Sequence, residues 1–465
     1  MKPGDIIENL EVIDIADEGK AVCKSDGVVI FIDKAVPGDI VNVKIRKKHK
    51  SFFEGSVHSI VQPSKERTTP VCHHFGTCGG CKWQHFSYSM QLQFKQKQVE
   101  DAMTRIGKLE SPNILPIIGS AEQVFYRNKL DYSFADRKWL TREEMNVDEP
   151  AFEPGLGFHI PGKFDKVLDI RQCYLQADPS NDIRLSVRKY CVENQMPFMN
   201  IRKREGMMRG LIIRNTTIGG LMVIVMVYQD EEGKLNGLLE HLKNNFPQIT
   251  SLLYVINNKA NDTIHDQEIH CYHGKEYIEE QMENLTFRIG PKSFFQTNGK
   301  QALVLYQVAR EFANLKGNEV VYDLYTGTGT IANFVAHQSK KVVGIEYVKE
   351  AIDDANVNSS INKVENTVFY AGDMKDLLTD DFMEQNGRPD VIITDPPRVG
   401  MHADVVKQLL KVACKKIVYV SCNPATQARD LEMLSEKYRV VKLQPVDMFP
   451  HTAHVENVAL LELID

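Results

Sequence analysis

The sequence lacks a hydrophobic run long enough to cross a membrane. No stretch approaches the roughly 18 apolar residues that a membrane helix needs. The first residues, MKPGDIIENLEV, also lack the basic-then-apolar layout of a signal peptide. We therefore expect a cytoplasmic protein that makes no membrane contact.

An excess of positive charge, the usual sign of a nucleic-acid-binding protein, is missing too, since the formal net charge is -6. Two local patches depart from this average: residues 44–50 read KIRKKHK and residues 202–204 read RKR. Each patch alone fits a solvated strand end or loop as well as it fits RNA contact. Overall charge therefore does not decide whether the protein binds RNA.

Disulfide bonds are not expected among the nine cysteines, because a cytoplasmic chain keeps its thiols reduced. Metal ligation or nucleophilic catalysis is the better interpretation. Cys72, Cys78 and Cys81 follow the pattern C-x5-C-x2-C, which needs a fourth ligand to close a zinc site or an iron–sulfur cluster. Spacing alone favours neither metal. The candidates for that fourth ligand are a remote cysteine and three histidines: His73, His74 and His85.

Three segments of the chain differ in pattern, and 465 residues are too many for one core. Residues 1–62 read as short strands separated by turns, which predicts a small β-barrel of the OB type, a fold that commonly binds RNA. Residues 63–290 hold the cysteine-rich loop and then mixed helix and strand patterns, an α+β middle domain. Residues 291–465 alternate apolar strands with helices, which predicts a doubly wound, Rossmann-like α/β domain with a parallel sheet.

The last segment contains the signs of an adenosine-containing ligand. Residues 323–330, DLYTGTGT, follow a strand and open a helix, so their glycines let a ligand approach the backbone. The next strand ends at Glu346, whose carboxylate can accept from both ribose hydroxyls, and the third ends at Asp373, which can accept from an adenine amino group. A dinucleotide site would need a third glycine, which Thr330-Ile331-Ala332 does not supply. The pattern favours S-adenosylmethionine.

The residues that could react follow the next two strands. The fourth strand ends in DPPR at 395–398, where an amino-methyltransferase would carry an aromatic residue in place of Arg398. The fifth ends in SCNP at 421–424, and a cysteine in such a polar turn can be exposed and ionised, unlike Cys414 in its apolar surroundings. We therefore predict Cys422 as a nucleophile. It would add to carbon 6 of a uracil and make carbon 5 able to accept a methyl group. Glu456 is the candidate base for removing the carbon 5 proton.

These motifs together resemble one family. The ordered set FFQTN at 294–298, DLYTGTGT, DPPR, SCNP and HVE at 454–456 resembles the RNA uracil-5-methyltransferases, which act on tRNA and 23S rRNA. The resemblance extends over nearly the whole chain, and the N-terminal barrel resembles a TRAM domain. It implies class I, S-adenosylmethionine-dependent methylation of an RNA uridine at carbon 5, and it is closest to the 23S rRNA enzymes that carry a TRAM domain and a [4Fe–4S] cluster.

Carried over by position, the resemblance implies a role for twelve residues. Cys422 is the nucleophile and Glu456 the proton-abstracting base. The S-adenosylmethionine site is implied at Gln296, Tyr325, Thr330, Glu346, Asp373 and Asp395. The [4Fe–4S] ligands are implied at Cys72, Cys78, Cys81 and Cys173.

The expected partner is RNA, first 23S rRNA and second tRNA, bound by a monomeric enzyme. One alternative is a tRNA uridine-5 methyltransferase. Another is a base amino-methyltransferase that uses DPPR. An alternative from another class is a non-catalytic iron–sulfur RNA-binding factor for ribosome assembly, against which the presence of both Cys422 and Glu456 argues.

Overall fold

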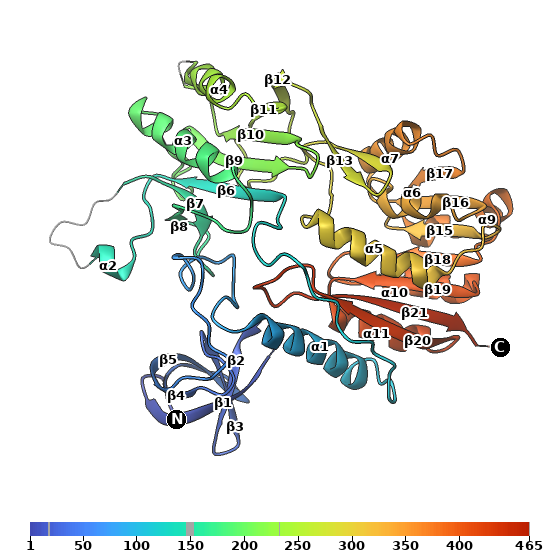
Figure 1. The fold of residues 1–465 in the computed structure, drawn as a ribbon, viewed down its shortest axis with the longest axis horizontal. Coiled ribbons are helices and arrows are strands. Elements are labelled where there is room, and N and C mark those ends of the chain that lie inside the picture. The colour runs from blue at the N-terminus through green and yellow to red at the C-terminus, as the bar shows by residue number, and fades with distance from the viewer. Residues whose placement is uncertain (17–18, 146–152, 232, 465) are drawn as a thin grey trace.

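The computed structural model describes residues 1–16, 19–145, 153–231 and 233–464, and Figure 1 shows a small barrel beside two larger sheet domains. Along these ranges, no helix combines the length and the hydropathy of a membrane span.

The N-terminal strands close into a barrel with the order β1-β2-β3-β5-β4, in which β4 pairs back to β1. Alternate residues point inward and form an apolar core of their own; Val12, Ile30 and Val43 are at most 1% exposed. The predicted N-terminal β-barrel is confirmed. Its strands are β1 (Ile6–Ile15), β2 (Ala21–Ser25), β3 (Val28–Asp33), β4 (Ile40–Lys48) and β5 (Phe52–Gln62).

A seven-stranded mixed sheet forms the middle of the molecule, in the order β12-β11-β10-β9-β6-β7-β8. Strand β10 is buried along its whole length, and it pairs with β9 through the turn at Gly219-Gly220. The strands are β6 (Lys129–Ala135), β7 (Gly155–His159), β8 (Val167–Asp169), β9 (Met208–Asn215), β10 (Leu221–Val227), β11 (Ser251–Ile256) and β12 (His270–Gly274). The helices of this part are α2 (Arg142–Met145), α3 (Ser180–Glu193) and α4 (Lys234–Asn245).

Helix α1 (Tyr88–Arg105) connects the barrel side of the molecule to the C-terminal sheet, where it lies along α11 and β20 (Figure 1). Ser87 begins it, since its hydroxyl accepts from the Met90 N–H. The hairpin β13 (Ile278–Met282) and β14 (Leu285–Ile289) leads from the middle sheet into the C-terminal domain. One apolar cluster contains residues from both sheet domains, including Met222, Leu305 and Val418. The domain boundary expected at residue 290 stays a prediction.

The C-terminal sheet has the order β17-β16-β15-β18-β19-β21-β20. Its first five strands are parallel, and β21 and β20 join antiparallel. The predicted doubly wound α/β domain is confirmed. The strand order reverses between β15 and β18, the position where open α/β sheets bind ligands. The strands are β15 (Val320–Leu324), β16 (Lys341–Glu346), β17 (Thr367–Ala371), β18 (Val391–Thr394), β19 (Lys416–Ser421), β20 (Tyr438–Val446) and β21 (Glu456–Leu463). The helices are α5 (Gly299–Ala313), α6 (Thr330–Ala336), α7 (Lys349–Ile361), α8 (Met374–Leu377), α9 (Asp380–Asn386), α10 (Ala403–Val412) and α11 (Pro424–Leu434).

Candidate active site

Cys422 and Glu456 stand together at the carboxyl edge of the C-terminal sheet. Cys422 follows the last residue of β19, and Glu456 is the first residue of the antiparallel neighbour β21. The last pair of the ladder between them is Ser421 opposite Asn457. The sheet register therefore brings the nucleophile and the base predicted from the sequence into one place.

The Cys422 thiol is half-buried among charged groups. Burial raises its pKa to about 11, and the nearby Glu456 and Asp395 carboxylates act in the same direction. The guanidinium of Arg398 opposes them, because a positive charge and a hydrogen bond favour the thiolate. Arg398 is thus the cation that this chain supplies next to the thiol.

Glu456 is almost completely buried, with 4% of its surface exposed. Burial raises its pKa to about 8, and the charge of Asp395 adds to the shift. Asp395 itself is raised to about 7 by burial. A carboxyl whose pKa lies near neutrality is suited to take up and release a proton at the operating pH.

Two loops at this edge are joined by hydrogen bonds through Arg398. Its carbonyl oxygen accepts from the Asn423 amide at 3.1 Å and from the Thr426 hydroxyl at 3.2 Å. Its guanidinium contacts the His454 ring at 2.5 Å. The pKa of His454 is lowered to about 4, first by burial and then by Arg398, so its neutral ring can accept from the guanidinium. Arg398 therefore connects the DPPR motif to both the SCNP motif and the HVE motif.

The turn after β15 leaves room for a ligand to approach its backbone. Tyr325 and Gly327 both have positive φ, +62° and +54°. A Cβ placed on Gly327 would meet no atom within 4 Å, so the space in front of this residue is open. Glu346 accepts the Gly327 N–H at 3.2 Å and the Val348 N–H at 3.0 Å, which orients its carboxylate at the end of β16. One oxygen of the fully buried Asp323 has no hydrogen-bond partner, and burial raises the pKa of that carboxyl to about 7.

The remaining cofactor residues predicted from the sequence surround the same edge. Asp373 begins α8 and accepts from the Lys375 ammonium at 2.6 Å. Thr330 begins α6, with its hydroxyl 3.3 Å from that of Thr328. Gln296 is buried in the FFQTN segment and hydrogen-bonds Tyr306.

A cleft of about 700 Å³ opens onto Cys422. Its walls come from three parts of the chain: strands β1 to β3 of the barrel, helix α1, and the loops that carry Cys422 and His454. Apolar side chains such as Phe31 and Phe94 stand beside charged ones such as Lys97. Cys422 is therefore accessible from the side where the barrel faces the C-terminal domain.

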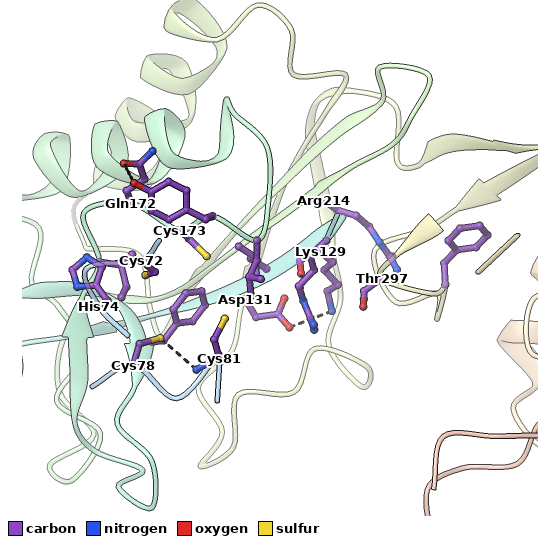
Figure 2. A pocket seen from close by; sticks show the side chains of 18 of the residues that line it. Cys72, His74, Cys78, Cys81, Lys129, Asp131, Gln172, Cys173, Arg214 and Thr297 are labelled. Atoms are coloured by element: carbon purple, nitrogen blue, oxygen red, sulfur yellow. Dashed lines mark hydrogen bonds and ion pairs between the residues drawn. The ribbon is translucent and has the colours of Figure 1, made fainter. Parts of the chain in front are cut away.

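The four cysteines expected to hold a cluster line one pocket of about 540 Å³ in the middle domain. Figure 2 shows Cys72, Cys78, Cys81 and Cys173 around one end of it, with Arg214 and Thr297 at the other end. The Gly80 N–H donates to the Cys78 sulfur at 3.4 Å. Cys173, 92 residues or more from the others in the sequence order, is thus brought to the triplet by the fold.

Two of the three histidines considered as a fourth ligand have other contacts. His74 accepts the Arg171 N–H through Nε2 at 3.0 Å, and His85 is buried with Nε2 3.3 Å from the Ala35 carbonyl oxygen. Within the described ranges, no group of three His, Cys, Asp or Glu side chains has the geometry to hold a metal ion. The cluster expected from the sequence therefore stays a prediction.

One residue near this site, Tyr306, carries no signal in the sequence. Tyr306 lies in α5 with its hydroxyl among Asp395, Glu456 and Asp323, and burial raises its pKa well above the ordinary value. The sequence around it reads only as an apolar helix face. Its hydrogen bond with Gln296 could be found only in the folded chain.

The model of the tRNA (uracil-5-)-methyltransferase family matches residues 214–464. A Porphyromonas gingivalis protein named as an RNA methyltransferase is 57% identical, over 97% of this chain and 99% of the relative. The chain belongs to this uracil-5-methyltransferase family. A Chlorobaculum tepidum RNA methyltransferase is 37% identical over 99% of this chain and 97% of its own length. The resemblance drawn from the motifs is confirmed, as is the enzyme class, an S-adenosylmethionine-dependent RNA (uracil-5-)-methyltransferase.

A solved structure is similar along the whole chain. It is the Pyrococcus abyssi tRNA (uracil-54, C5)-methyltransferase in complex with S-adenosyl-L-homocysteine, with a TM-score of 0.76 and 28% identity. The match covers 98% of this chain and 100% of that one. The similarity to this relative therefore includes the barrel and both sheet domains.

Proposed function

We propose that the enzyme methylates carbon 5 of one uridine in 23S rRNA through a covalent adduct between Cys422 and carbon 6. The observation that carries this proposal is the adjacency of Cys422 and Glu456 at the ends of β19 and β21. A nucleophile and a base at one sheet edge are the two groups that methylation at a ring carbon requires.

The reaction begins with addition of the Cys422 thiolate to carbon 6 of the uracil, which moves electron density to carbon 5. S-adenosylmethionine supplies a methyl group as an electrophile for carbon 5. Glu456 then accepts the proton of carbon 5, the double bond between carbons 5 and 6 forms again, and the carbon–sulfur bond breaks to release the thiolate. Arg398 favours the thiolate of Cys422 at both ends of this cycle.

The turn after β15 fits S-adenosylmethionine. The open space at Gly327 admits a ligand where a side chain would fill it. The hydrogen bond from the Gly327 N–H orients the Glu346 carboxylate, which would accept from the ribose hydroxyls. The P. abyssi relative, whose fold is similar along the whole chain, was solved in complex with S-adenosyl-L-homocysteine. Gln296, Tyr325, Thr330, Asp373 and Asp395 complete the proposed site.

The cleft in front of Cys422 is the proposed path of the RNA. Carbon 6 of a stacked base cannot be reached, so the uridine must leave its stack and enter from the cleft. The barrel strands and α1 that line the cleft would contact the neighbouring nucleotides.

The pocket of the four cysteines is the proposed site of a [4Fe–4S] cluster. Each thiolate would bind a different iron, so the sulfurs need to surround a space rather than meet at a point. The Arg184 guanidinium beside Cys173 is fully buried, and its Nε has no hydrogen-bond partner. Its terminal nitrogens donate to the Ile170 and Arg171 carbonyl oxygens. A buried guanidinium with a free Nε next to four thiolates suits an anionic cluster. The cluster would hold the cysteine loop to the middle sheet.

The proposed RNA class rests on the four cysteines together with the barrel, a combination that the sequence shares with the 23S rRNA enzymes. A second candidate substrate is tRNA, because the P. abyssi relative that covers the whole chain is named for uracil 54 of tRNA. We further propose that the enzyme acts in the cytoplasm as a monomer.

A covalent trap tests the mechanism and the RNA class together. The protein is incubated with S-adenosylmethionine and 5-fluorouridine-substituted 23S rRNA or tRNA, and run on a denaturing gel. Fluorine cannot leave as a proton, so a Cys422 adduct should persist with the true substrate. The Cys422→Ala variant should give no adduct, and Cys414→Ala, which alters a buried thiol in the same domain, should keep it. An equal adduct in Cys422→Ala contradicts the mechanism, and an adduct with tRNA alone replaces the proposed RNA class.

A further inference from the structure

The segment 447–455, here called the base loop, joins β20 to β21 and ends immediately before Glu456. Its conformation therefore decides where the carboxylate of Glu456 stands. Proton abstraction from carbon 5 needs that carboxylate within hydrogen-bond reach of the reacting atom. A displacement of about 1 Å can cost roughly a hundredfold in rate.

A buried ion pair anchors the start of the base loop to helix α1. Lys95 Nζ lies 2.5 Å from Asp447 Oδ1, and neither side chain has any exposed surface. The same ammonium donates to the Phe449 carbonyl oxygen at 3.0 Å. Asp447 also accepts from the Tyr88 hydroxyl at 2.7 Å and from the Phe449 N–H at 3.1 Å. Both carboxylate oxygens of Asp447 thus accept hydrogen bonds, and Lys95 donates to two oxygen atoms of the base loop.

Other contacts extend this anchorage along the base loop. Gln91, one helical turn before Lys95, accepts the His451 N–H at 2.8 Å. The Asn298 amide donates to the Met448 carbonyl oxygen at 2.9 Å, and the Tyr126 hydroxyl donates to that of Pro450 at 3.0 Å. The loop that carries Glu456 is therefore held by α1, by the FFQTN segment and by the middle domain.

Helix α1 is also a wall of the cleft in front of Cys422. Phe94, Lys97, Gln98 and Asp101 line that cleft, while Lys95 points to the base loop. One helix thus faces the proposed path of the RNA and fixes the loop of the proposed base. The barrel closes through its own strands, so the contact between α1 and the base loop is not needed to form it.

We propose that Lys95 and Asp447 are positioning residues for proton abstraction, which hold the base loop so that Glu456 reaches carbon 5 after methyl transfer. This inference rests on the proposed function, because it requires Glu456 as the base. Addition of Cys422 and methyl transfer depend on β19, on the turn after β15 and on Arg398. Arg398 contacts the base loop through His454, at the opposite end of the loop from Asp447, and its carbonyl oxygen is held outside the loop by Asn423 and Thr426. Loss of the pair should therefore slow the last step selectively.

The double variant Lys95→Met/Asp447→Leu tests this inference without leaving one buried charge unpaired. Two single-turnover rates are measured on RNA with tritium at carbon 5 of uridine: methyl transfer to RNA and release of tritium. In the wild type, tritium release should keep pace with methyl transfer. In the double variant, release should slow by about a hundredfold, methyl transfer should change by less than about threefold, and a denaturation-resistant adduct with ordinary RNA should accumulate.

The matched control is Glu280→Gln, which alters a buried carboxylate that accepts from Thr217 and Gln281 in another part of the chain. It should lower the melting temperature and leave the two rates coupled. Equal slowing of both steps in the double variant overturns the inference. If the double variant does not fold, Tyr88→Phe decides, because it removes one hydrogen bond from Asp447 and keeps both charges. It should uncouple the rates in the same direction, and unchanged coupling there overturns the inference.

The variant Glu456→Gln separates this inference from the proposed function. It should trap the methylated adduct in the same assay. If it traps the adduct and the positioning variants do not, only the positioning role fails. If Glu456→Gln turns over normally, Glu456 is not the base, and the proposed function and this inference fall together.

Discussion

Ser421 lies opposite Asn457 in the antiparallel ladder of β19 and β21, and Cys422 and Glu456 are the next residues, both beyond the same end of that ladder. An antiparallel pair runs in opposite directions, so the end of one strand meets the beginning of the other. The ladder fixes the ends of the two strands, and Cys422 and Glu456 are the residues at those ends. Their separation should therefore change little when substrate binds.

The burial of Glu456 predicts a decline of stability with rising pH. Its pKa is raised to about 8 in the folded chain, so the folded state holds a proton that the unfolded chain releases at lower pH. This contribution to stability is complete below the ordinary carboxyl pKa and is lost as pH rises through about 8. Between pH 6 and pH 9 the melting temperature should fall less for Glu456→Gln than for the wild type. Each kcal/mol of stability lost corresponds to about 2–4 °C in melting temperature. The control is Glu462→Gln on the same strand, where the carboxylate pairs with Arg439 at the surface. Parallel curves for wild type and Glu456→Gln would contradict the buried, protonated carboxyl.

The charge of Arg398 should control the reactivity of Cys422. Because Arg398 opposes the raised thiol pKa, Arg398→Gln should lower the thiolate fraction, and one pKa unit corresponds to about tenfold in adduct formation. Arg398→Lys should restore most of the rate, since it keeps the positive charge. The measurement is the rate of adduct formation with 5-fluorouridine RNA at pH 7.

The matched control for this prediction is Arg388→Gln, an exposed arginine of the same domain that pairs with Asp380. It should react at the wild-type rate. Equal losses in Arg398→Gln and Arg398→Lys would show that the shape of the guanidinium matters and not its charge.

Glu346 should decide the affinity for S-adenosylmethionine. Its carboxylate is oriented by the Gly327 and Val348 N–H groups, and an amide at this position loses one of the two acceptor oxygens. Hydrogen bonds to charged groups contribute about 1.5–3 kcal/mol, so Glu346→Gln should weaken binding by roughly tenfold or more. Calorimetric titration measures this directly. The exposed Glu350→Gln on α7 should bind as the wild type does, and an unchanged Kd in Glu346→Gln would remove this residue from the site.

Cys173 should be needed for iron. If the four cysteines hold a [4Fe–4S] cluster, Cys173→Ser should lower the iron content and the visible absorbance of anaerobically purified protein, and it should lower the melting temperature. Cys271→Ser, which alters an exposed thiol outside the pocket, should leave the iron content unchanged. Full iron content in Cys173→Ser, or zinc in place of iron in the wild type, would refute the proposed cluster.

Much of the fold was predictable because its signals are local. Alternating apolar residues between Gly and Asp turns predicted the barrel, and apolar strands with helices between them predicted the β15 to β19 order along the chain. The motifs also predicted that Cys422 lies at a strand end.

The family, the N-terminal barrel and the C-terminal α/β fold could be read from the sequence alone, because their signals lie in short runs of neighbouring residues. The residues that react stay a prediction. The tertiary structure decided which of these residues meet. The antiparallel addition of β21 brings Glu456 to Cys422, and Lys95 and Asp447 pair across 352 positions of the chain. It also decided the pKa values near neutrality at Glu456 and Asp395, because burial raises them and burial exists only in the folded chain.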